Sequence, residues 1–310
     1  MSTKDSITKK FLSRDDIFAD AFNYLLFDGK NVIKPGDLAE QDPNEIAAFK
    51  KLGTVFASQK YRDVLKMCTI KHNSFATLVL LGIEAQSNVN YAMPVRDLLY
   101  DALNYSEQVD EIARKHKEAH DLKGDEYLSG FSGKDKIKPV ITLCICFDKK
   151  NWDAPRSLYE MFGDIDPSVL RFVDDYRLNL MTPDEIGDFG KFSSELGLLM
   201  EFIHKSNDKA GMCDIIKSRK DDFLNVDVST VNMINTYSSM NISTENEKGG
   251  HIDMCQAFQE ILADERAEGR AENALENIRN LMKNMKWTAK QAMDALGITE
   301  EDRSKYLAKL

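Results

Sequence analysis

The chain of 310 residues has no long apolar run. No run approaches the roughly 18 apolar residues that a membrane-spanning helix needs. The longest runs, 76–83 and 140–147, have the length of strands. The chain begins Met-Ser-Thr-Lys-Asp and lacks the apolar core of a signal peptide. We therefore expect no membrane partner and a cytoplasmic location.

Cysteine is scarce and odd in number. There are five cysteines, and none of them forms a CxxC pair. In a chain that we expect to stay in the cytoplasm, this pattern predicts reduced and mostly buried thiols. Cys144 and Cys146 lie two residues apart in an apolar run, so they should share one face of a strand and pack in a core.

Positive charge is outnumbered by negative charge. The chain has 41 Lys and Arg against 51 Asp and Glu, a net charge of −10. This balance disfavours a protein that coats nucleic acid with its whole surface, although a local basic cluster can still bind phosphates. The hydrophobic share of 43% and the charged share of 30% exclude a disordered, collagenous or repeat-only chain.

The hydrophobic pattern predicts a mixture of helices and strands. The runs 61–70 and 74–86, separated by Lys71-His72-Asn73, predict a β-hairpin. The run 140–147 is apolar nearly throughout and predicts a strand buried on both faces. Helical spacing or composition predicts further elements, namely helices over 17–26, 46–56, 93–117, 187–204 and 227–237, with a short strand near 176–180. The order predicts an α/β fold with a mixed sheet flanked by helices.

A polar stretch near the C-terminus divides the chain. Residues 241–250, NISTENEKGG, are typical of a linker between a main domain, 1–240, and a helical tail, 251–310. A long helix is predicted over 252–285, and a narrow stripe of small and apolar residues along it favours close pairing with another helix. The stripe consists of Ala263, Ala267, Ala271, Ala274, Ile278, Leu281 and Met285. Thr288 and Thr299 should cap two shorter helices after the long helix. We expect the tail to be an oligomerisation or accessory segment that makes the protein a homo-oligomer.

Three polar residues stand out in the hairpin: Asp63, Glu84 and Gln86. If the turn is formed by His72-Asn73, Asp63 lies opposite Gly82 and Glu84 is its diagonal neighbour, with Cα atoms ~7–8 Å apart. Gln86 shares a face with Glu84 because the two are two residues apart.

Two carboxylates beside an amide suit a hard cation such as Mg²⁺ or Mn²⁺. Such an ion can polarise a phosphodiester and activate a water molecule. The alternative is that Asp63 and Glu84 are ordinary strand-end residues at the rim of the sheet.

Several stretches resemble the bacterial Rpn family of recombination-promoting nucleases, also described as PD-(D/E)XK nuclease family transposases. The resemblance spans most of the chain and is most specific between Asp63 and Tyr105. The stretches that carry it are Phe18–Gly29 with Val32–Pro35, Arg62–Lys66, Gly82–Ser87, Tyr91–Arg96, Leu99–Tyr105, Lys138–Val140 with Trp152, and the tail from Ala263 to Ile298.

The resemblance implies a restriction-endonuclease-like (PD-(D/E)XK) fold and Mg²⁺-dependent DNA cleavage, with a role in DNA recombination. It makes Asp63 and Glu84 the metal carboxylates and Asp20 an acidic residue of the site on the first helix. Gln86 stands where the wider superfamily usually has lysine, and glutamine can donate hydrogen bonds but carries no charge. The alternative for Asp20 is a carboxylate in a helix first turn, favoured by the helix dipole.

Basic residues of the helix over 93–117 are candidates for DNA-backbone contacts. Arg96 lies one turn into the helix and could meet a phosphate. The alternatives are a salt bridge with Asp97 or Asp101, or simple exposure to solvent. Lys115 and Lys117 belong to a basic cluster that fits a DNA backbone, with an ordinary solvated surface as the alternative.

Two other classes of function compete with the nuclease. A catalytically degenerate DNA-binding or oligomerising protein on the same fold is favoured by Gln86, by the net charge and by the tail. A helix-turn-helix regulator is disfavoured, because the last helix begins with Glu300, Glu301 and Asp302, where phosphates would approach.

Overall fold

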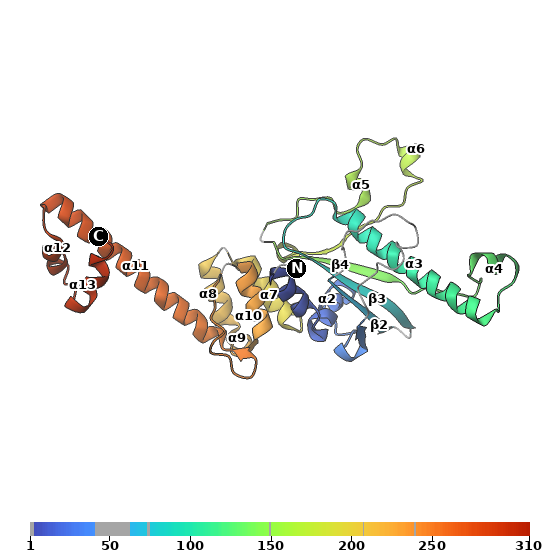
Figure 1. The fold of residues 1–310 in the computed structure, drawn as a ribbon, viewed down its shortest axis with the longest axis horizontal. Coiled ribbons are helices and arrows are strands. Elements are labelled where there is room, and N and C mark those ends of the chain that lie inside the picture. Colours follow the sequence, from blue (N-terminus) through green and yellow to red (C-terminus); the bar gives the residue numbers. More distant parts are fainter. Residues whose placement is uncertain (1–2, 41–62, 73–74, 149, 207, 239) are drawn as a thin grey trace.

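A five-stranded mixed sheet lies at the centre of the computed structural model, which describes residues 3–40, 63–72, 75–148, 150–206, 208–238 and 240–310 (Figure 1). The strands lie side by side in chain order: β1 (Leu38–Glu40), β2 (Val64–His72), β3 (Phe75–Gln86), β4 (Val140–Cys146) and β5 (Asn179–Met181). The first three strands are antiparallel, whereas β3, β4 and β5 run parallel. The predicted α/β class, with a mixed sheet flanked by helices, is confirmed. The expected helix over 46–56 lies outside the described residues.

The predicted hairpin forms, but its register is not the predicted one. His72 pairs with Phe75, and Leu65 rather than Asp63 pairs with Gly82. When the connection between two strands moves by one position along the chain, each residue of one strand faces a residue two positions further along the other. The sequence near residue 73 has no glycine that would indicate which two residues form the connection. The predicted pairing of Asp63 with Gly82 is therefore wrong. Continued by one step, the observed register brings Asp63, which precedes β2, opposite Glu84.

The two faces of β4 are both buried, as its apolar run predicted. Leu143 and Ile145 pack in the main hydrophobic core. Cys144 and Cys146 point to the opposite face, where they pack with Met93. Both cysteines are free thiols and at most 1% exposed, so the predicted core role of these two thiols is confirmed.

Helices from both ends of the main domain cover the main-core face of the sheet. They are α1 (Thr3–Leu12), α2 (Asp15–Phe27), α7 (Glu195–Lys205) and α10 (Val228–Ser238). The sequence did not predict α1, because its apolar residues are few, yet Phe11 and Leu12 are fully buried. The helix predicted from residue 187 begins at Glu195, where the Ser194 hydroxyl accepts the N–H of Leu196. Short 3₁₀ turns at Pro35–Asp37, Pro183–Glu185 and Phe189–Lys191 lie between the larger elements.

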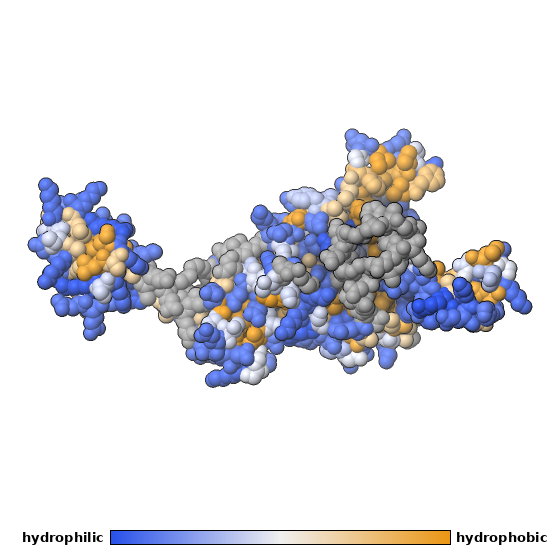
Figure 2. All heavy atoms as spheres, in the orientation of Figure 1, coloured by the Kyte–Doolittle hydropathy of each residue, from blue (hydrophilic) through white to orange (hydrophobic). Residues whose placement is uncertain are grey.

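The other face carries α3 (Met93–Ala119), with Pro94 in its first turn. The far half of α3 projects from the sheet, and the short α4 (Gly124–Ser129) lies at its far end (Figure 1). A second projection carries α5 (Leu158–Met161) and α6 (Pro167–Leu170). Figure 2 shows apolar side chains gathered on it. Val169 and Phe172 in this segment are exposed.

The start of the expected tail packs with the main domain. The strand β7 (His251–Ile252) pairs with β6 (Val226–Asp227), next to α8 (Lys209–Ser218) and α9 (Lys220–Phe223). The side chains of Ile252, Met254 and Phe258 are buried in the main core. The chain between 241 and 250 is also anchored, because the side chain of Asn235 exchanges two hydrogen bonds with the backbone of Ile242.

The rest of the tail extends away from the core along α11 (Met254–Met285), as Figure 1 shows. At its far end α12 (Ala289–Ala295) and α13 (Glu300–Leu307) fold back against it. Thr288 and Gln291 form the predicted capping box of α12. Ile278 and Leu281, which belong to the predicted stripe, pack against Ala292 and Met293 within the same chain. No helix in the described ranges combines the length and the apolar character needed to cross a membrane.

Candidate active site

Asp63 and Glu84 meet at the end of the β2–β3 hairpin. The Oδ2 atom of Asp63 accepts the backbone N–H of Ala85 at 2.8 Å, which ties Asp63 to the residue after Glu84. Residues that lie opposite each other in an antiparallel pair point to the same face. Glu84 and Gln86 share that face, as their spacing predicted. The hairpin therefore brings the two predicted carboxylates together, although by direct opposition rather than on a diagonal.

Glu84 is buried against the first turn of α3. Its side chain is 1% exposed, and its Oε1 atom forms an ion pair with Arg96. The Nε2 atom of Gln86 donates to the same oxygen at 3.1 Å and to the carbonyl of Ala85 at 3.0 Å. The Nε atom of Arg96 donates to the hydroxyl of Tyr100 at 3.0 Å. The structure thus shows Arg96 in an ion pair, as one of its alternatives expected, but the partner is Glu84 instead of Asp97 or Asp101.

Burial controls the protonation of this cluster. Desolvation raises the pKa of Asp63, while the N–H of Ala85 and the charges of Arg96 and Lys9 oppose the rise. The charge of Asp5 adds to it. Desolvation, followed by the charge of Glu84, raises the pKa of Tyr100 to about 12. Tyr100 therefore keeps its proton at neutral pH and can accept from Arg96 only through its oxygen lone pairs.

The N-terminal helix closes the site from the other side. The hydroxyls of Thr8 and Tyr237 are hydrogen-bonded at 2.8 Å, and that of Tyr237 reaches Ser87 at 3.2 Å. Thr8 thereby anchors α1 across the end of β3, directly after Gln86. The ammonium of Lys4 lies 4.1 Å from the centroid of the Tyr237 ring. Sequence reasoning missed this side of the site, because α1 itself was not predicted.

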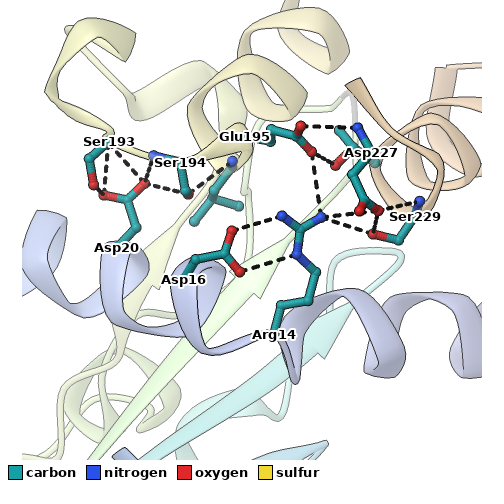
Figure 3. Close-up of polar contacts among 10 residues, drawn as sticks. Arg14, Asp16, Asp20, Ser193, Ser194, Glu195, Asp227 and Ser229 are labelled. Carbon is teal, nitrogen blue, oxygen red and sulfur yellow. Dashed lines mark hydrogen bonds and ion pairs between the residues drawn. The ribbon is translucent and has the colours of Figure 1, made fainter. Parts of the chain in front are cut away.

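Asp20 serves a different set of contacts. Its carboxylate accepts the N–H and hydroxyl groups of Ser193 and Ser194, at distances from 2.6 to 3.1 Å (Figure 3). These bonds hold the start of α7 against α2. Besides desolvation, it is the charge of Asp5, on the N-terminal helix α1, that raises the pKa of Asp63. Asp20 was expected beside the Asp63–Glu84 site, but its carboxylate instead holds the start of α7.

Arg14 forms a second structural cluster beside Asp20. Its guanidinium lies within 3.5 Å of carboxylate oxygens of Asp16, Glu195 and Asp227. It also donates to the hydroxyl of Ser229 at 3.0 Å. Figure 3 shows these groups converging from α2, α7 and the start of α10. The cluster ties the N-terminal helices to the C-terminal part of the main core.

Lys115 and Lys117 lie far from the carboxylates. Both are exposed on the projecting part of α3, and Lys115 pairs with Glu111 at 2.7 Å. Lys115 follows Arg96 by 19 positions, which corresponds to about 28 Å along a helix axis. A ligand that meets these lysines and the hairpin site must extend along α3.

The chemistry of the site suits a hard cation. Within the described ranges, no three His, Cys, Asp or Glu side chains form a metal-binding group. Mg²⁺ in proteins commonly uses only one or two carboxylates, with water and substrate phosphate in the remaining positions. Asp63 and Glu84 can supply those two carboxylates. The donor set therefore fits Mg²⁺ or Mn²⁺, provided that Glu84 shares its charge between the ion and Arg96.

Comparison of the chain with protein-family models, with curated proteins and with solved structures finds no match.

Proposed function

We propose that this protein is a Mg²⁺- or Mn²⁺-dependent DNA endonuclease with a restriction-endonuclease-like (PD-(D/E)XK) fold. The observation that supports this most is the pairing of Asp63 with the buried Glu84 at the end of the central hairpin. The resemblance of residues 63–105 to Rpn-family nucleases supports the same substrate. A role in promoting DNA recombination is part of this proposal.

The roles follow from the contacts of each residue. Asp63 and Glu84 would hold the cation, which when bound stabilises negative charge on the phosphate and activates water. Arg96 compensates the charge of Glu84 when Glu84 is buried. Gln86 orients Glu84 through its amide N–H. The neutral amide adds no charge to the site, so any further cation must come from another element.

A plasmid cleavage assay tests the proposal. Purified protein is incubated with supercoiled plasmid in Mg²⁺, in Mn²⁺ and in chelator, and nicked and linear products are separated on a gel. We expect nicking or linearisation that depends on the divalent ion. Absence of cleavage under both ions would contradict the proposed enzyme.

The ion pair between Glu84 and Arg96 favours a second candidate, a catalytically inactive DNA-binding protein on the same fold. In such a protein the arginine would neutralise the buried carboxylate permanently and no metal would be needed. Binding of duplex DNA in chelator, without cleavage in either ion, would favour this candidate over the nuclease.

A further inference from the structure

The site lacks a positive charge that is available to a substrate among the residues nearest to Glu84. Gln86 is neutral, and its amide nitrogen donates to Glu84 and to the Ala85 carbonyl. Arg96 is held by Glu84 and by Tyr100. Without a bound metal ion, a phosphate that approaches these carboxylates would meet mostly negative charge, and a cation from another element would favour its binding.

The helix α1 lies where it can supply that cation. Thr8 is 3% exposed and is linked through Tyr237 to Ser87, the residue that follows Gln86. This chain of hydroxyls fixes the middle of α1 over the end of β3. Lys9 is the next residue, one turn after Asp5 and one turn before the fully buried Leu12. Lys9 therefore lies at the border between the exposed and the buried sides of α1, next to the position that Thr8 fixes over the end of β3.

The charge of Lys9 acts on the carboxylate site, and its ammonium is available to bind a substrate. Its side chain is half-buried, and its charge acts favourably on the carboxylate of Asp63. Within the described part of the chain, no hydrogen bond or ion pair engages its ammonium. The fully buried Lys66 contrasts with it, because its ammonium is bound by Asp15 at 2.5 Å and by the Ser13 carbonyl at 2.6 Å.

We propose that Lys9 supplies, from α1, the positive charge that Gln86 cannot supply, and that it binds a phosphate group of the nucleic acid at the Asp63–Glu84 site. This inference rests on the proposed function. It places the phosphate between α1 and the end of β3, with Lys9 balancing the charge of Asp63 when the substrate enters. Lysine suits this role because its ammonium is a compact charge that binds phosphate without a fixed geometry.

The neighbouring Lys10 provides a matched control. It is exposed and lines the cleft between α1 and α10, beside Arg14 and Asn232, instead of the carboxylate site. Lys9→Met and Lys10→Met remove the same charge from consecutive residues of one helix. Lys9→Arg keeps the charge, and Lys9→Gln is a second neutral variant in case methionine impairs folding.

The test measures binding and cleavage separately in the full chain. Binding of a fluorescein-labelled duplex is followed by anisotropy in chelator over a range of salt concentrations. We expect Lys9→Met and Lys9→Gln to reduce the slope of log affinity against log salt concentration by about one, which corresponds to the loss of one phosphate contact. We expect their plasmid cleavage in Mg²⁺ to fall roughly a hundredfold. Lys9→Arg should retain most of both properties, and Lys10→Met should match the wild type.

The outcomes separate this inference from the nuclease proposal. If the wild type cleaves DNA and the neutral Lys9 variants cleave equally well, the role of Lys9 is overturned and the nuclease stands. If the wild type binds but does not cleave, the nuclease fails, and the salt dependence alone decides the role of Lys9. Equal losses in Lys9→Met and Lys10→Met would show a diffuse charge effect and would overturn the assigned site. A wild type that neither binds nor cleaves DNA would overturn both proposals.

Discussion

Glu84 and Arg96 form an ion pair across the face of β3, with the carboxylate 1% and the guanidinium 25% exposed. A carboxylate so deeply buried is stable in its charged form only when a partner compensates it. Arg96 is therefore part of the architecture of the site, and removing it should have a cost in folding as well as in any activity.

We predict that Arg96→Met lowers the free energy of unfolding by about 3–5 kcal/mol, because it leaves Glu84 buried without its cation. Chemical denaturation monitored by circular dichroism measures the change. Lys115→Met is the matched control, since its exposed pair with Glu111 contributes only about 0.3–0.5 kcal/mol. Equal effects of the two substitutions would contradict a structural role for the Glu84–Arg96 pair.

We predict that Asp20→Ala destabilises the main domain by about 3 kcal/mol or more, because four donor groups of Ser193 and Ser194 lose a charged acceptor. Asp16→Ala removes one of the three carboxylates around Arg14, and because its side chain is 45% exposed it should cost less, about 1 kcal/mol. Thermal melts of both variants measure the difference. A fully stable Asp20→Ala protein would show that these hydrogen bonds do not anchor α7.

The sequence predicted the parts of the fold that depend on local pattern. The hairpin, the doubly buried β4 and the helix from Met93 follow from the spacing of the apolar residues. The carboxylate pair could also be predicted from the sequence, because Asp63 and Glu84 are acidic residues at the ends of apolar strands. The register of β2 against β3 could not be predicted, because it depends on which residues form the turn and the sequence there contains no glycine.

Long-range contacts limited the rest of the site prediction. The contact between Asp20 and Ser193 joins residues 173 positions apart, and nothing in the local pattern of α2 indicates it. The contribution of α1 depends on Thr8 meeting Tyr237 across 229 positions. An unpredicted helix that packs through few apolar residues thus supplied Asp5 and Lys9, which no motif had indicated.

We predict that the base of α4 loosens as pH rises. The ring nitrogens of His116 lie 2.8 Å from Asp121 Oδ1 and 2.9 Å from Asp135 Oδ2, and these hydrogen bonds raise the pKa of His116. A histidine with a raised pKa stabilises the fold fully below its unfolded value of about 6.5, and this contribution is lost as pH rises through the folded pKa.

The His116 effect is measured by the difference in unfolding free energy between wild type and His116→Gln across this pH range. The difference should shrink with increasing pH, and an NMR titration should place the His116 pKa above its ordinary value. Asp121→Asn should bring that pKa down. A stability difference that grows with pH would contradict the assigned ion pairs.

We predict that the position of a C-terminal truncation decides whether the main domain remains stable. Ending the chain at Gly250 removes Ile252, Met254 and Phe258 from the core, at roughly 1.5–3 kcal/mol for each side chain. Ending it at Ala263 keeps all three. The longer product should melt close to the full chain, and the shorter one well below it.

The same two truncations test self-association through the tail, which we propose on the basis of the long α11. Light scattering should show the full chain as an oligomer and the product ending at Ala263 as a smaller species. If the product ending at Ala263 contains the same number of chains per particle as the full-length protein, the oligomer forms through the main domain instead.

The most direct test of the central claim is plasmid cleavage by Asp63→Asn. Asparagine has the shape of aspartate, and its side-chain oxygen can still accept the N–H of Ala85, so the hairpin should remain folded. Glu84→Gln is less clean, because it also breaks the ion pair with Arg96. With the wild-type melting temperature verified, the Asp63→Asn protein should lose divalent-dependent cleavage almost completely. Wild-type cleavage by this folded variant would contradict the assignment of Asp63 and Glu84 as the catalytic metal site.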